Sequence, residues 1–237
     1  MKRLFRFITK LKRFVIESFR TIINIFKYGP SAPRFNEIIW VDPKKIKMGL
    51  HENVVKKYFG FKKCDISGSV VHSTWPEEQS FHLFALVDPI VLKSESKLTW
   101  EDSVRIRIQS CIDHWGKGIP WDQTMAYKRL EKKIKEKGSF EGCKTHYDIS
   151  KRYEKLDQIF DQVKAEGRLR LKKESDFHLT IKKNQEAIIH IGPMGELYYG
   201  GGSTHRFAIA YILNLPFPSR VGVVHIKAIP ILKQLRK

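Results

Sequence analysis

The stretch GGGSTHRFAI, from Gly200 to Ile209, is the most informative part of the sequence. Its glycines can take positive φ and let a ligand approach the backbone closely. The residues that follow have the pattern of an amphipathic helix, whose first turn carries unpaired N–H groups and a partial positive charge. Arg206 adds a planar set of donors suited to phosphate or carboxylate. The stretch therefore predicts an anion site; a glycine turn with Ser203 as helix N-cap and no ligand is the alternative.

Strands are expected on both sides of this helix. Residues 187–191 and 197–199 are apolar runs separated by the turn sequence GPMG, which predicts a hairpin. Prolines in the sequence NLPFP at 214–218 end the helix, and residues 220–225 have the composition of another strand. The predicted order is hairpin, glycine turn, helix and closing strand.

This order, with the His-Arg pair at the helix start, resembles the ParB/sulfiredoxin superfamily. A predicted helix that ends at Gly167 and an opening strand and turn at 38–46 resemble further parts of that superfamily. The resemblance covers about residues 36–47 and 150–227. It implies an α+β fold with a mixed sheet at 37–237, interrupted by a helical insertion at about 60–147.

Three departures from the superfamily limit what the resemblance implies. Thr204 stands where sulfiredoxins place a reactive cysteine, and a hydroxyl cannot do that thiol chemistry. Gly202 stands where the free-serine kinases of this fold carry an aspartate. Residues 227–237 are too few for the helix-turn-helix domain of chromosome-segregation ParB proteins, so we do not expect sequence-specific DNA binding.

After these departures, the resemblance still implies a nucleotide-binding site. We expect phosphates on Gly200, Gly201, Gly202, Ser203 and Thr204, and catalytic roles for His205 and Arg206. The missing acid has to come from a distant segment, and Asp113 is the first candidate, with Glu141 and Asp148 as others. The expected cofactor is ATP, ADP or CTP with Mg²⁺. No histidine spacing marks a metal site formed by the protein alone.

Two classes of function remain open, together with a third reading. The first is an ATP- or ADP-dependent phosphotransferase or an NTPase. The resemblance implies a small hydroxylated or glycan-related acceptor, because the ParB-like proteins that this chain resembles often accompany surface-glycan biosynthesis enzymes. The second is a non-catalytic module that binds a nucleotide or phosphosugar and docks at a membrane or partner. The third is nonspecific nucleic-acid binding, with an affinity that falls steeply with salt.

Composition limits the partners and the cellular location that can be expected. The 237 residues carry a formal net charge of +19, which favours polyanionic partners such as nucleic acid, anionic lipid or phosphorylated substrates. Three cysteines without CxxC spacing fit neither a disulfide framework nor a structural zinc site. Charged residues interrupt the apolar N-terminal stretch, so neither a signal peptide nor a membrane span is expected. We therefore expect a cytoplasmic protein, with a peripheral membrane location as the alternative.

Residues 1–28 form the second informative segment. Eight Lys or Arg and one Glu give it a charge of +7. Its apolar residues recur every three or four positions, which predicts one stripe on a helix: Leu4, Ile8, Leu11, Val15, Phe19, Ile22 and Phe26. A basic amphipathic helix of this kind is typical of segments that lie in an anionic membrane interface. Packing of the stripe on the protein's own core or on a partner is the alternative. The linker at 29–36, which opens with GPSAP, ends the helix.

The middle of the chain predicts three helices. The first begins after Thr99 as N-cap and continues to about Trp115; the second runs from about Asp122 or Thr124 to Gly138. The third begins near Asp148 or Ser150 and ends at Gly167. Asp113 and His114 are adjacent and point about 100° apart, so a local dyad is not expected, and His114 is assigned to the last helical turn. The charge run 129–137 is expected to be solvated, and residues 69–72 and 81–87 are expected strands.

Overall fold

The computed structural model describes residues 19–61, 66–88, 98–171 and 186–236. The strands are β1 (Ile38–Val41), β2 (Met48–Gly49), β3 (Ser69–Val71), β4 (Phe81–His82), β5 (Ala187–Ile191), β6 (Leu197–Gly201) and β7 (Phe217–His225). The helices are α2 (Glu52–Tyr58), α4 (Trp100–Cys111), α5 (Met125–Lys137), α6 (His146–Glu166), α7 (Thr204–Leu213) and α8 (Ile229–Leu235), and residues 19–28 are also helical. The expected α+β class is confirmed.

One mixed sheet contains all seven strands of the described residues, in the order β1-β7-β5-β6-β2-β4, with β3 also paired to β7. β7 runs antiparallel to β1 and parallel to β5 and β3. The hairpin of β5 and β6 is antiparallel, as the turn sequence predicts. The strand expected at 81–87 is wrong beyond His82, because the chain turns there.

The predicted helices α4, α5 and α6 are present, and their ends follow the expected chemistry. Thr99 forms a capping box with Asp102 at the start of α4. Gly138 and Gly167 end α5 and α6 with φ of 73° and 63°, a conformation that favours glycine. The α6 helix begins earlier than expected, at His146, because Thr145 and Asp148 form a second capping box. The α4 helix continues into a π-helical turn, η4 (Ile112–Gly116), which reaches the expected end near Trp115.

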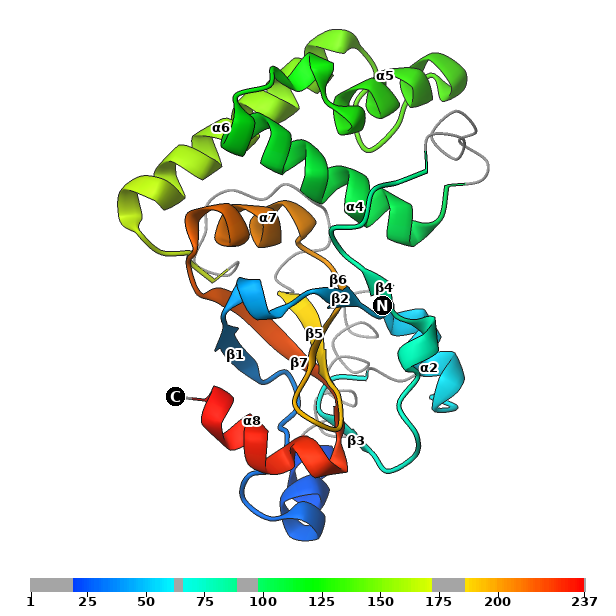
Figure 1. The fold of residues 1–237 in the computed structure, drawn as a ribbon, viewed down its shortest axis with the longest axis vertical. Helices are drawn as coiled ribbons and strands as arrows, with labels where there is room; N and C mark the ends of the chain where they lie inside the picture. Colours follow the sequence, from blue (N-terminus) through cyan, green and yellow to red (C-terminus); the bar gives the residue numbers. More distant parts are fainter. Residues whose placement is uncertain (1–18, 62–65, 89–97, 172–185, 237) are drawn as a thin grey trace, which may run out of the picture.

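The α7 helix lies between the sheet and the layer of α4, α5 and α6 (Figure 1). Phe207 and Ala210 pack into the main core with the inner face of the sheet. Ala208 instead packs with the helical layer, against the group that includes Tyr153 and Leu156. His205 precedes Ala208 by three residues, so both lie on the side of α7 that faces the helical layer.

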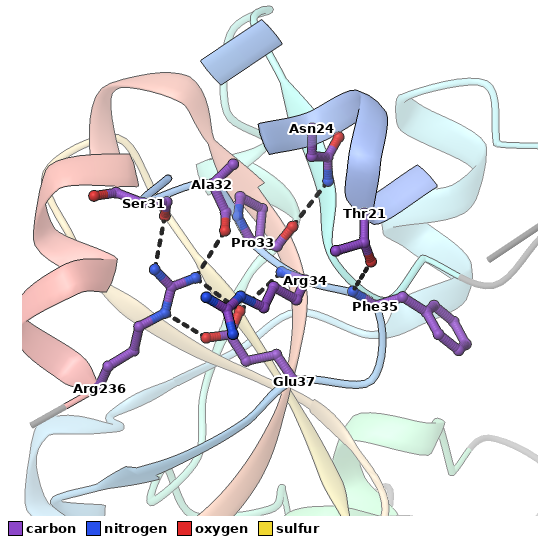
Figure 2. A network of polar contacts seen from close by, with 9 residues as sticks. All are labelled: Thr21, Asn24, Ser31, Ala32, Pro33, Arg34, Phe35, Glu37 and Arg236. Atoms are coloured by element: carbon purple, nitrogen blue, oxygen red, sulfur yellow. Dashed lines mark hydrogen bonds and ion pairs between the residues drawn. The ribbon is translucent and has the colours of Figure 1, made fainter. Parts of the chain in front are cut away.

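The two ends of the described chain meet at the opposite end of the molecule, where α8 lies near the helix of residues 19–28 (Figure 1). Figure 2 shows the polar contacts that join each of them to residues 31–37. Arg236 pairs with Glu37 and donates to the backbone carbonyl of Ala32 at 2.7 Å. Within the described ranges, no helix has the length and apolar content to cross a bilayer.

Candidate functional site

The glycine turn has the backbone conformation that its sequence suggests. Gly201 and Gly202 have φ of 123° and 81°, values that favour glycine. The Trp100 ring lies against Gly201, where a Cβ would come within 3.2 Å of it. Gly200 faces the buried His190, and a Cβ there would come within 2.4 Å of Nε2. The three glycines thus allow both the sharp turn and the close packing around it.

Ser203 occupies the N-cap position of α7, but its side chain does not cap the helix. Its backbone lies in the left-handed region, with φ 54° and ψ 36°. The Oγ atom is buried and has no hydrogen-bond partner within the described part of the chain. The alternative of an ordinary serine cap is therefore wrong, because the left-handed turn directs this hydroxyl away from the first-turn N–H groups.

Tyr199 braces the start of α7 from inside. Its ring is fully buried, and its hydroxyl donates to the Gly202 carbonyl. The same oxygen lies 2.9 Å from the Thr204 Oγ1 atom. Burial raises the Tyr199 pKa well above its ordinary value, so the hydroxyl stays protonated. Thr204 is thus held by an internal hydrogen bond at the position expected to contact phosphate.

Arg206 contacts Glu186 just before β5 and Arg170 just after α6. Its guanidinium forms an ion pair with Glu186 at 2.9 Å and donates to the Arg170 carbonyl. The Glu186 side chain is 5% exposed and that of Arg206 is 16% exposed. Arg206 therefore fastens the first turn of α7 to the residues before β5.

His205 projects into a small cavity between α4, α5, α6 and the loop that joins α5 to α6. The cavity has a volume of about 20 Å³, enough for about one water molecule. Polar side chains dominate one part of its lining: Arg107, Arg129, Glu141, Arg152 and His205. The structure thus brings the predicted His205 together with groups from α4, α5, α6 and the loop between α5 and α6.

Glu141 connects two of these arginines. Its carboxylate pairs with Arg107 from α4 and with Arg152 from α6, the latter at 2.7 Å. Arg152 also donates to the Glu141 carbonyl at 3.0 Å. Burial alone would raise the pKa of Glu141, but Arg107 and Arg152 outweigh burial and hold it below its usual range. The carboxylate is therefore ionised at neutral pH.

The loop that carries Glu141 is tightly turned. Glu141 has φ of 48°, and Gly142 follows with φ of 85°. Phe140 and Cys143 exchange backbone hydrogen bonds of 2.9 and 3.0 Å across the turn. A left-handed conformation at a residue other than glycine costs roughly 1–3 kcal/mol. Here the pairing with two guanidiniums offsets that cost.

His205 is neutral in this environment. Burial lowers its pKa most, the nearby Arg152 and Arg107 charges lower it further, and Glu141 opposes them in part. Together they bring the pKa of His205 to about 3. His205 as a whole is only partly buried. The close packing of neighbouring side chains around it therefore accounts for the desolvation. An anion placed among these groups would raise this pKa again.

Of the three acids considered from the sequence, the structure brings Glu141 to His205. Asp113 lies on η4, where it binds Lys117 and Gln109 at 2.7 and 2.9 Å. It does not line the cavity. Asp148 is occupied by its capping box, in which its carboxylate accepts from the Lys144 and Thr145 N–H groups.

His114, the neighbour of Asp113, belongs to a separate aromatic cluster. Its Nδ1 donates to the Ile119 carbonyl at 2.7 Å, and its Nε2 lies 3.2 Å from Asp157. The ring stacks on Trp121, whose indole N–H also binds Asp157. His114 thus closes the turn after η4 and does not form a dyad with Asp113.

Sequence reasoning missed Arg107 and Arg152. Arg107 lies between Ile106 and Ile108 on a helix that is enclosed on most sides, so its side chain is only 26% exposed. The Arg129 position was assigned to a solvated charge run, yet it lines the cavity. An arginine between two core residues was the available signal in the sequence. Comparisons with family models, curated proteins and solved structures give no match.

Proposed function

We propose that this protein binds a phosphorylated ligand, with a nucleotide as the leading candidate, at the cavity beside the first turn of α7. The observation that carries the proposal is the convergence of Arg107 and Arg152 on one carboxylate next to His205. Two guanidiniums from different helices form the arrangement that recognises phosphate oxygens. The Glu141 carboxylate occupies the position that a ligand anion would take.

The size of the cavity requires Glu141 to move when the ligand binds. A volume of about 20 Å³ does not hold a phosphate group. Displacement of the Glu141 side chain would free both guanidiniums. Glu141 therefore acts as an internal competitor that sets a threshold for ligand affinity.

The glycine turn supports a site that continues toward the start of α7. The Ser203 hydroxyl is buried there without a partner in the described residues, and a ligand oxygen would provide one. At Gly202 the space where a side chain would begin is bordered within 4 Å by backbone atoms of Glu186 and Ala187. In this arrangement, Arg206 positions the helix through Glu186, and Arg107 and Arg152 take over the charge-neutralising role expected of it.

Phosphoryl transfer is the activity that we propose for this site. The bond between the transferred phosphorus and its leaving oxygen breaks, and a bond forms to the oxygen of an acceptor hydroxyl. The hydroxyl proton passes to neutral His205, whose affinity for it rises once phosphate is bound. Magnesium bound to a nucleotide needs few protein ligands, and the displaced Glu141 carboxylate is the available one beside the cavity.

A non-catalytic binding module is the second candidate. It is favoured by the internal engagement of Arg206, for which a catalytic role is expected from the sequence. Both candidates share the anion site and differ only in turnover.

We also propose that the chain has the ParB/sulfiredoxin-like fold. It is supported by the order of the β5–β6 hairpin, the glycine turn, α7 and β7, and by the antiparallel pairing of β1 with β7. The helical insertion at about 60–147 would then contain α4 and α5 and supply Arg107 and Glu141 to the site, and α6, which resembles the superfamily's helix before the hairpin, would supply Arg152.

Incubation with Mg²⁺ and ATP, ADP or CTP tests these candidates. Release or transfer of phosphate that is lost in Arg152→Gln but retained in Lys151→Gln supports the enzyme, because Lys151 is an exposed neighbour on the same helix. Binding without turnover, again lost in Arg152→Gln alone, supports the module. Neither binding nor turnover with the whole panel, including inorganic phosphate and pyrophosphate, contradicts the proposal.

A further inference from the structure

The helix of residues 19–28 attaches to the protein through its polar side. Asn24 is 7% exposed and donates to the carbonyls of Pro33 and Gly68 at 2.9 and 2.7 Å. Thr21 Oγ1 accepts from the Phe35 N–H at 2.9 Å, and the Tyr28 hydroxyl binds His72. Figure 2 shows Asn24 and Thr21 directed at the chain that follows the helix. Residues 21, 24 and 28 are spaced i, i+3 and i+7, so they form one face.

The opposite face is apolar and exposed. Phe19, Ile22, Ile23 and Phe26 are 62%, 59%, 48% and 94% exposed. Their spacing of i, i+3, i+4 and i+7 defines a single stripe along the helix. A helix that packs on its own protein normally buries its apolar stripe. The helix of residues 19–28 instead buries its polar face. The alternative that the stripe packs on the protein's own core is therefore wrong for residues 19–28.

The sequence before this helix keeps the same pattern. Leu4, Ile8, Leu11 and Val15 fall at helical spacing in phase with Phe19, and residues 1–28 carry eight Lys or Arg against one Glu. Residues 1–18 lie outside the described part of the chain. A segment with this combination of apolar stripe and positive charge has the composition of an interfacial helix, and its charged residues are too frequent for a span.

We infer that residues 19–28 dock the protein on an anionic lipid surface, with Phe19, Ile22, Ile23 and Phe26 in contact with the lipid. The positive charge of the N-terminal segment favours anionic lipid over a second copy of the protein. Two copies joined through this face would bring two segments of +7 together, whereas anionic headgroups attract them. The inference does not depend on the phosphate site, which lies on the far side of the sheet near α7.

Sedimentation of the full chain with vesicles tests the inference. Vesicles of phosphatidylcholine with phosphatidylserine are compared with vesicles of phosphatidylcholine alone. The variant Ile22→Ser/Phe26→Ser removes the exposed stripe. The matched control Leu86→Ser/Met194→Ser removes two apolar side chains that are 85% and 78% exposed elsewhere. Both variants change exposed positions, so their thermal unfolding should match that of the wild type.

We expect the wild type and the control to bind the anionic vesicles, and the stripe variant to bind at least about tenfold more weakly. Binding should also weaken as salt is raised. Equal binding of the stripe variant, or equal binding of the wild type to neutral vesicles, overturns the inference. So does a self-association that the stripe variant abolishes while the wild type leaves the vesicles unbound, because the stripe would then join two copies.

Discussion

Glu141 and Arg152 form an ion pair of 2.7 Å that joins the loop after α5 to the α6 helix. The same carboxylate also pairs with Arg107 on α4, so three segments of the helical layer meet at one negative charge. His205 from α7 lines the same cavity. This arrangement links the sequence motif after the glycines to residues that lie up to about a hundred positions earlier in the chain.

Substitution of Arg152 by Gln should weaken phosphate binding. Loss of one guanidinium removes a charge-assisted pair of donors, and we expect at least a tenfold loss of affinity for pyrophosphate. Isothermal titration calorimetry measures it, with Lys151→Gln as the control because that side chain is 53% exposed. Equal affinities of the two variants would exclude Arg152 from the site.

Substitution of Glu141 by Gln should have the opposite effect on binding. The side chain keeps its size but no longer competes as an anion, so pyrophosphate affinity should rise by about tenfold. Glu154→Gln on the exposed face of α6 is the matched control. An unchanged affinity would mean that Glu141 does not occupy the anion position. If the variant also loses turnover, Glu141 takes part in the chemistry as well.

The helix ends were predictable because their chemistry is local. Thr99 with Asp102, Gly138 and Gly167 act within one turn of the chain, so the sequence contains the whole signal. The β5–β6 hairpin was predictable for the same reason. His205 was singled out from its position after the glycine turn.

The partners of His205 were not predictable in this way. Arg107 and Arg152 lie on α4 and α6, and only the packing of those helices against α7 brings them to one cavity. Ser203 shows a related limit: its residue type suits a cap, but the turn imposed by Gly201 and Gly202 puts its backbone in the left-handed region. The periodicity of residues 19–28 gave the two faces of the helix correctly and could not tell which face meets the protein.

Arg236 should contribute to stability by joining α8 to the linker. Its guanidinium contacts both carboxylate oxygens of Glu37 and the carbonyls of Ser31 and Ala32 (Figure 2). Arg236→Ala removes the guanidinium from these acceptors, of which only the Glu37 carboxylate keeps another donor among the described segments, the Arg34 N–H. We expect the free energy of unfolding to fall by about 2 kcal/mol. Urea denaturation measures the change. Lys233→Ala, at an exposed position of the same helix, should be nearly neutral.

The stability of the protein should fall on acidification because of His190. This residue is fully buried on β5, and its Nδ1 accepts the Val223 N–H at 3.1 Å. Burial, with smaller effects of nearby positive charges, lowers its pKa from 6.5 to about 3. The unfolded chain binds this proton below pH 6.5 and the folded chain does not. The contribution is therefore complete above pH 6.5 and is lost as the pH falls toward 3.

At pH 5 the loss amounts to about 2 kcal/mol relative to neutral pH. Denaturation of the wild type and of His190→Asn at both pH values measures it. The variant should be less stable at neutral pH but should show a smaller difference between the two values. The exposed His82→Asn serves as control and should keep the wild-type difference. An equal pH dependence of His190→Asn and the wild type would contradict the assignment.

The most direct test of the anion site is a crystal structure of the full chain grown with pyrophosphate. We expect the anion within hydrogen-bond distance of Arg107, Arg152 and His205, with the Glu141 carboxylate displaced from both guanidiniums. A structure in which Glu141 still binds both arginines while the anion lies elsewhere, or is absent at saturating concentration, would contradict the proposal.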